Sequence, residues 1–223
     1  MISIIAMHAF SPIRNVSKSS EVFNKLRTAI WSGELPPGTP LREARLAKQL
    51  HVSQVPVREA LLRLENLGLV VRIADKGTHV TKLTRAEMVQ LLEVRSHLED
   101  LAFRLASKRL TPEIEAELVE RLADIEKTAR ANDHFAVAKA DLKFHQAVWK
   151  ASGNPLLEKT LDRLCVSVYA FISLQRHTAH EKLATASHEP LMDALRKHDA
   201  KMISKSIRDH LDPDLFIPAS IAD

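Results

Sequence analysis

The 223 residues of the chain leave room for two modest domains, each able to bury its own core. Hydrophobic residues make up 45% of the sequence and only 5 glycines are present, a composition that favours helix over sheet. The one cysteine, Cys165, excludes an internal disulfide framework, and its apolar neighbours predict a core position. Residues 1–10 are apolar but too short to span a bilayer, and they lack signal-peptide features, so we expect a cytoplasmic protein.

Charge is divided unevenly along the chain. Residues 1–82 contain 12 Lys and Arg against 6 Asp and Glu, whereas residues 83–223 contain 20 against 22. A basic first part joined to a near-neutral second part predicts an anionic polymer as the partner of the first and a smaller ligand for the second.

The first part of the chain predicts three helices followed by a β-hairpin. Apolar spacing and breaks at glycine and proline place helices at 19–33, 42–50 and 54–67, and β-like runs at 69–73 and 78–81. Ser53 is a suitable N-cap for the third helix, and Pro56 is tolerated in its first turn. Three helices and a small hairpin describe a winged helix-turn-helix domain, which we place at residues 18–83.

Many residues of this domain match, in type and in order, the sequence pattern of a known protein family. They are Ile30, residues 33–38 (GELPPG), 41–43 (LRE), Leu46, Ala47, Val52, Ser53, residues 56–61 (PVREAL), Leu64, residues 68–70 (GLV), Gly77 and Val80. With these residues, the stretch 22–83 resembles the DNA-binding domain of the GntR family of bacterial transcription regulators.

This resemblance implies that the helix after Ser53 enters the major groove of duplex DNA, with its N-terminal residues at the bases and phosphates. Ser53 and Arg58 match the family's contact positions, and Gly77 lets the wing approach the minor groove. For Arg58 the alternative is a solvated surface charge. Gln54 and Val55 occupy the DNA-facing place where the family commonly has an Arg-Thr pair. Because an arginine that reads guanine or clamps a phosphate is missing there, the family's usual operator sequence is not expected.

The second part of the chain predicts a mainly α fold. The linker, residues 81–84, contains no glycine or proline, so closely docked domains are expected. Thr84 and Glu87 have the spacing of a capping box at the start of the next helix. The predicted helices are 85–109, 112–131, 134–152, 155–176, 187–198 and 199–211. We therefore expect an antiparallel six-helix bundle over residues 84–213, with any cofactor site between facing helices.

A candidate metal site lies in this bundle. Asp141 and His145 are four residues apart and project from one face of a helix, a usual spacing for two ligands of one cation. His188 opens the fifth helix and His210 closes the sixth, so an antiparallel hairpin turning near His198 would bring them together. Three imidazoles and one carboxylate suit zinc, nickel, manganese or iron. The alternative is that these are ordinary surface or core histidines, of which the chain contains 11 in all.

Other histidines are weaker candidates. His134 lies on the same helical stripe as Asp141 but about 10 Å away along the axis, too far to share one ion. His177 and His180 lie in a predicted connection and could substitute for one ligand. The histidines expected at the surface or on the DNA side are His51, His79 and His97.

A second set of residues is similar to a known effector domain. They are residues 93–95 (EVR), Leu98, Glu99, Asp141, Phe144, His145, residues 152–154 (SGN), His188, Leu195 and residues 208–210 (RDH). They resemble the FCD domain that accompanies GntR heads in the FadR subfamily, and the six-helix count resembles its VanR-type branch. In metal-binding members of that group the ligands are an Asp, a His four residues later, and two further His near the C-terminus. The resemblance implies that Asp141, His145, His188 and His210 hold a divalent ion, with zinc the first choice.

Arg95 is the candidate effector-binding residue. Its neighbours one turn away are mostly apolar, and an arginine buried among them needs an anionic partner. One interpretation is an ion pair with Glu99. The other is that Arg95 and the metal hold a small carboxylate between them, which agrees with the organic acids that the resemblance implies as effectors.

These observations predict a homodimeric transcription regulator, a repressor rather than an activator, that binds a double-stranded DNA operator and responds to a small carboxylate at the metal. One alternative is that the metal itself is the signal. Another is a metal-dependent enzyme, because a site of this kind with open positions can activate water. The basic first domain argues against an enzyme.

Overall fold

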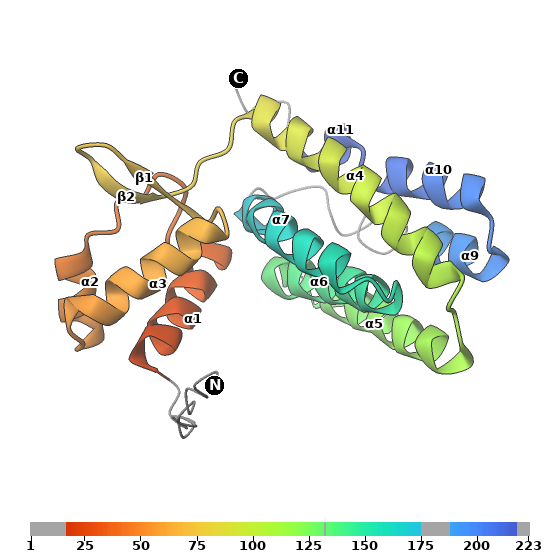
Figure 1. Cartoon of the computed structure of the whole chain (residues 1–223), viewed down its shortest axis with the longest axis horizontal. Helices are drawn as coiled ribbons and strands as arrows, with labels where there is room; N and C mark the ends of the chain where they lie inside the picture. Colours follow the sequence, from red (N-terminus) through yellow and green to blue (C-terminus); the bar gives the residue numbers. More distant parts are fainter. Residues whose placement is uncertain (1–16, 132, 175–187, 218–223) are drawn as a thin grey trace, which may run out of the picture.

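A computed structural model describes residues 17–131, 133–174 and 188–217 and arranges them as a small head beside a bundle of helices (Figure 1). The head consists of α1 (Lys18–Trp31), α2 (Glu43–Leu50), α3 (Gln54–Asn66), β1 (Val70–Ile73) and β2 (Gly77–Val80). The predicted fold class, a winged helix-turn-helix followed by a helical domain, is confirmed. None of the described helices is long and apolar enough to cross a membrane.

The wing is an antiparallel hairpin packed on the helices of the head. Val70 pairs with Val80 and Ile73 pairs with Gly77, and an isolated bridge joins Pro40 to His79. Apolar residues from all three helices and both strands form one buried cluster. Its members include Val22, Leu26, Ile30, Ala47, Val57, Leu61, Leu64, Val70 and Val80. The spacing of these residues on each helix is the pattern that predicted the elements.

The C-terminal end of α3 forms a Schellman motif. The Leu69 amide donates to the Leu64 carbonyl at 3.0 Å, and the Gly68 amide donates to the Glu65 carbonyl at 2.9 Å. Gly68 has a φ of +71°, in the left-handed region that this motif requires. Gly77, in the wing, has a φ of +84°. Both positions therefore favour glycine because of backbone conformation.

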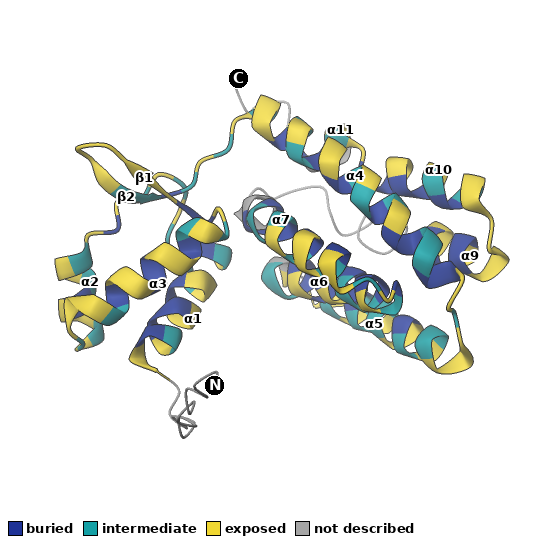
Figure 2. Ribbon diagram, in the orientation of Figure 1, coloured by how far each residue is buried: buried dark blue, intermediate teal, exposed yellow. Residues whose placement is uncertain are grey.

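The bundle consists of α4 (Arg85–Ser107), α5 (Pro112–Arg130), α6 (His134–Ala151), α7 (Pro155–Leu174), α9 (Glu189–Lys197), α10 (Ala200–His210) and α11 (Pro213–Phe216). The long helix α4 packs against α6, α7, α9 and α10, and α5 packs along α6. Figure 2 shows the buried faces of these helices turned toward one another. The short helix α11 was not predicted. It is tied to α4 by Arg85, which donates to Asp214 Oδ1 at 2.9 Å and to the Ile217 carbonyl at 3.3 Å.

Two predicted helix starts had different outcomes. The capping box is confirmed, because Thr84 accepts from the Glu87 amide while the Glu87 carboxylate accepts from the Thr84 amide. Ser53 occupies the N-cap position of α3, but its side chain makes no capping hydrogen bond. The amides at the start of α3 are therefore not capped by this hydroxyl.

The head is docked on the bundle through α7. Ala170 belongs to the buried cluster of the head, and Ser167 donates to the Leu67 carbonyl at 3.0 Å. Arg163 Nε donates to the Asn66 carbonyl at 2.8 Å. These contacts confirm the close docking of the two domains that the linker composition predicted. The two hydrogen bonds hold the C-terminal end of α3.

Two glycine substitutions should separate the effect of backbone conformation from that of docking. Gly77→Ala places a Cβ in open space, whereas a Cβ on Gly68 would lie 2.7 Å from Ser167 Oγ. Both changes cost about 1–2 kcal/mol from the left-handed φ. We expect Gly68→Ala to destabilise the protein more than Gly77→Ala in chemical denaturation, since it also disturbs the contact with α7. Equal losses would contradict the docking described above.

Candidate functional site

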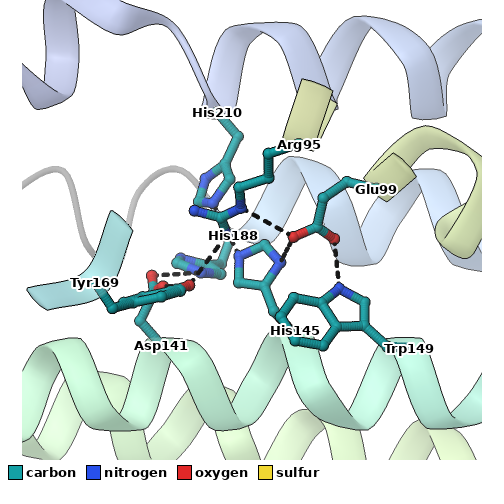
Figure 3. A network of polar contacts seen from close by, with 8 residues as sticks. All are labelled: Arg95, Glu99, Asp141, His145, Trp149, Tyr169, His188 and His210. Carbon is teal, nitrogen blue, oxygen red and sulfur yellow. Dashed lines mark hydrogen bonds and ion pairs between the residues drawn. The ribbon is translucent and has the colours of Figure 1, made fainter. Parts of the chain in front are cut away.

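Four predicted ligands meet in the centre of the bundle. Asp141, His145, His188 and His210 each offer one ligand atom, and these atoms all lie within 4.8 Å of one another. All four residues are buried. Asp141 and His145 lie one turn apart on α6, while His188 and His210 come from the α9–α10 region (Figure 3).

The α9–α10 hairpin brings the two distant histidines together. His198 ends α9 with a φ of +53°, and Asp199 caps α10 by accepting from the amides of Lys201 and Met202. The chain therefore reverses at His198, as predicted. His188 is the N-cap residue of α9 and His210 is the last residue of α10, and their ring centroids are 4.6 Å apart.

His145 lies between a carboxylate and the centre of the cluster. Its Nδ1 is 3.0 Å from Glu99 Oε1, and its Nε2 is 3.0 Å from His210 Nε2. A proton on Nδ1 that faces the carboxylate leaves the Nε2 lone pair directed at the other ligands. A carboxylate behind a histidine is the usual outer partner of a metal-binding imidazole.

Like His145, Asp141 has one polar atom directed at the cluster and one that contacts a residue outside it. Oδ1 lies 3.1 Å from His188 Nε2, inside the cluster, and Oδ2 accepts a hydrogen bond from the hydroxyl of Tyr169. One oxygen is thus available to a cation, while the other is held by α7.

Arg95 and Glu99 form a buried ion pair beside the cluster. Their side chains are 1% and 0% exposed, and Arg95 Nε donates to Glu99 Oε1 at 3.2 Å. Arg95 Nη2 also donates to the Tyr169 hydroxyl at 3.1 Å, and Trp149 Nε1 donates to Glu99 Oε2 at 2.8 Å. The interpretation of Arg95 as the partner of Glu99 therefore describes this structure. Neither Tyr169 nor Trp149 was predicted to belong to the site. The only sequence signal is that Trp149 lies four residues after His145.

The surroundings set the protonation of two ligands. Burial opposes the charge on Asp141, but the hydrogen bond from His188 and the imidazoles of His188, His145 and His210 hold its pKa well below the usual range. Burial, reinforced by His188 and His145, lowers the pKa of His210 well below its usual range. An ionised carboxylate and a neutral imidazole are the forms that bind a metal.

Burial raises the pKa of the Cys165 thiol to about 12, which agrees with the predicted core position.

The donor set fits a divalent metal ion. Bonds of about 2.1 Å allow two ligand atoms of one ion to be at most about 4.2 Å apart, so small side-chain movements bring this cluster into range. Two imidazole nitrogens 3.0 Å apart need a shared proton or a cation between them. Three nitrogens and one oxygen suit zinc and also nickel, manganese or iron.

The weaker histidine candidates are not part of the cluster, or they lie outside the described residues. His51 and His97 are exposed, and His79 is half-buried in the wing. His134 is the first residue of α6, and its side chain is not described. His177 and His180 lie outside the described residues.

The residues predicted to contact DNA lie at the start of α3 and in the wing. Ser53, Gln54 and Val55 are exposed, and Val55 is 61% exposed although apolar. The Arg58 side chain is 64% exposed, and its Nε donates to Glu43 Oε2 of α2 at 3.0 Å. This contact uses Nε of the guanidinium, and the side chain as a whole stays largely exposed.

Residues 18–80 match the family model described as bacterial regulatory proteins, gntR family, and residues 90–213 match the FCD domain model. The chain belongs to the GntR family. It is therefore a DNA-binding transcription regulator with an FCD domain, and these matches favour a regulator over the metal-dependent enzyme considered above.

Relatives of this GntR regulator cover most of its length. It is 31% identical over 202 residues to a probable D-xylose utilization operon transcriptional repressor of Paenarthrobacter nicotinovorans, covering 91% of this chain and 88% of the relative. It is 32% identical over 186 residues to the Nta operon transcriptional regulator of Aminobacter aminovorans, covering 81% and 87%. The solved structure of E. coli McbR/YncC is similar with a TM-score of 0.75 at 25% identity, covering 90% of this chain and 96% of that one. The VanR-type branch stays a prediction.

The buried ion pair should behave as a coupled unit. Glu99→Leu leaves the Arg95 charge without its carboxylate, so we expect a loss of about 3–5 kcal/mol in the free energy of unfolding. Arg95→Met in the same background removes the stranded charge and should recover part of the loss, with a coupling of about 1–3 kcal/mol. Chemical denaturation of both single variants and the double variant measures it. Simple additivity of the single effects would show that the pair is not coupled.

Proposed function

We propose that this GntR regulator is a homodimeric repressor whose DNA binding responds to a small organic acid bound at a divalent metal ion in the bundle. The observation that carries the proposal is the buried cluster of Asp141, His145, His188 and His210, with ligand atoms within 4.8 Å, in a chain that also has a DNA-binding head. Two heads would bind the two half-sites of a pseudo-palindromic operator.

The head, taken as residues 18–83, would bind DNA through the start of α3. Ser53, Gln54 and Val55 would face the major groove, and Arg58 would reach a phosphate or a base edge. The wing turn at Gly77 would lie toward the minor groove. Repression as the direction of control is supported by the name of the D-xylose operon relative.

The bundle, taken as residues 84–213, would bind the metal and the effector. The metal, zinc in the first instance, would supply a positive charge that accepts a carboxylate oxygen of the effector. Arg95 would offer its guanidinium to the second oxygen, in competition with Glu99 and Tyr169. Effector binding would then shift the bundle between two packings and change the position of the heads.

A metal-responsive regulator is the second candidate. It is favoured by one observation, namely that Arg95 is already paired with Glu99 inside the protein. In that case the metal alone would change operator affinity, and no organic acid would be needed.

A metal and effector titration tests these proposals. We expect one Zn²⁺ per chain after dialysis, measured by elemental analysis, and loss of this binding in His145→Ala. The exposed histidine variant His97→Ala is the matched control and should keep it. Operator duplexes selected from random sequences are then used in fluorescence anisotropy with a panel of sugar acids and aromatic acids. At least one acid should weaken binding by about 5–150-fold only when metal is present.

The possible results differ in meaning. An effect of Zn²⁺ alone that no acid alters would select the metal-responsive regulator. Absence of coupling with any ligand would contradict both proposals and leave a DNA-binding protein without a sensor.

The contact of Arg58 with DNA should appear in the salt dependence of binding. Each phosphate neutralised contributes a slope of about −0.9 to the dependence of log K on log salt. Arg58→Gln should therefore reduce the slope by about 1 if Arg58 binds a phosphate. Arg130→Gln removes the same charge from an exposed side chain on α5 and should leave the slope unchanged. A base contact would instead relax sequence preference at one position, and no change in either quantity would exclude Arg58 from the interface.

A further inference from the structure

One helix, α7, touches both the metal cluster and the DNA-binding head. Its C-terminal half carries Tyr169 into the polar network of the bundle (Figure 3). The next residue, Ala170, is part of the buried core of the head, and Val166 packs against that core. Two adjacent residues of a single helix therefore lie in two different environments, one in each domain.

The head contacts of α7 are made with the end of the helix proposed to read DNA. Arg163 donates to the carbonyl of Asn66, the last residue of α3, and Ser167 donates to the carbonyl of Leu67, its C-cap residue. Backbone carbonyls move only with the helix that carries them. A shift or rotation of α7 is therefore transmitted to α3 directly, without passing through the linker at 81–84.

Tyr169 connects α7 to a proposed metal ligand. Its side chain is buried, and its hydroxyl donates to Asp141 Oδ2. The Tyr169 hydroxyl oxygen also accepts a hydrogen bond from Arg95 Nη2 at 3.1 Å. A hydroxyl has one hydrogen to give, so Tyr169 is oriented by these two partners. The other oxygen of Asp141 lies in the cluster, 3.1 Å from His188 Nε2.

We propose that Tyr169 is the positioning residue through which occupancy of the Asp141 cluster changes the C-terminal turn of α3. The inference rests on the proposed metal site. When Oδ1 is engaged as a metal ligand, the Asp141 carboxylate would turn, and Oδ2 would move with it. The hydroxyl of Tyr169 follows its acceptor, and α7 carries the displacement to Asn66 and Leu67. Arg95 donates to the same hydroxyl, so a carboxylate effector that binds Arg95 would also act on Tyr169 and α7.

Hydrogen exchange of the full-length protein, read by mass spectrometry, tests this route with Zn²⁺ alone as the probe. In the wild type, saturating Zn²⁺ against chelator should slow exchange in residues 141–148, at the cluster. It should also change exchange in residues 64–70 by on the order of fivefold or more. Tyr169→Phe keeps the ring and removes the hydroxyl. Saturated with Zn²⁺, this variant should keep the effect at 141–148 and lose the effect at 64–70.

A second variant breaks the route at its other end. Arg163→Ala with Ser167→Ala removes both hydrogen bonds to α3 and leaves the network around Asp141 intact, so Zn²⁺ affinity should equal that of the wild type. The response at 64–70 should again be lost. Tyr169→Phe is expected to weaken Zn²⁺ binding by about 10–100-fold, as loss of an outer partner of a metal ligand does. The double variant therefore separates loss of transmission from loss of affinity.

Three results would overturn the inference. If Zn²⁺ changes hydrogen exchange of the wild type at 141–148 but not at 64–70, the route through Tyr169 is ruled out, while the metal site stands. An unchanged response at 64–70 in Tyr169→Phe, or in the double variant, would show that the displacement travels elsewhere. A wild type that takes up no Zn²⁺ would remove both this inference and the proposed function.

Discussion

A charged pair at the centre of the helical domain constrains the helices around it. Arg95 and Glu99 are almost completely removed from solvent, and burial of two charges is tolerated only when the remaining hydrogen-bonding atoms also find partners. Those partners come from other helices: Trp149 and His145 on α6, and Tyr169 on α7. A slip of one helix by a single turn would strand at least one of these groups. The polar network therefore sets the register of α4, α6 and α7 more sharply than the apolar contacts around it do.

The same pair completes the cluster of proposed ligands. The Glu99 carboxylate lies behind His145, and Arg95 lies behind Tyr169, which in turn holds Asp141. Burial alone would discourage a charged carboxylate here. The pKa of Glu99 is nevertheless below its usual range, because His145, Arg95 and Trp149 outweigh the opposing effect of burial. The ligands and their supports thus form one connected set, and a change at any member is felt by the others.

Local patterns in the sequence predicted most of the helices and strands, and they predicted that Asp141, His145, His188 and His210 would come together. The four-residue spacing of Asp141 and His145 determines their shared face, and the reversal at His198 brings His188 to His210. Each of these inferences needs only helix geometry and a short turn. Arg95 and Glu99 are also four residues apart on one helix, so their ion pair could be predicted as one of two interpretations of Arg95. The GntR resemblance added the order of the domains and the proposed role of α3 in DNA binding, which spacing alone does not supply.

Helix periodicity and turn patterns could not predict side-chain contacts between elements that are far apart in the sequence. Tyr169 lies 28 residues after Asp141, on another helix, and no periodicity relates them. Whether Tyr169 or a neighbouring residue faces the cluster depends on the rotation of α7, which is set by packing against α4, α6 and the head. The missing cap of Ser53 is a similar case. The residue type suits a cap, but the side-chain conformation that would make one is decided by the surroundings of the helix start. The short helix α11 depends on Arg85, at the far end of the bundle sequence.

The way in which the head is docked gives small movements a large effect. α3 has 13 residues and is therefore about 20 Å long. Its C-terminal end is held by α7 through Asn66 and Leu67, whereas Gln54 and Val55 lie at the opposite end. A rotation of about 5° at the held end displaces the other end by about 1.7 Å on this length. Hydrogen bonds to base edges weaken over a few tenths of an ångström, so such a displacement is large compared with their tolerance. A sensor in the bundle would therefore need no large rearrangement: a slight turn of α7 would be enough to displace the end of α3 that is proposed to face DNA.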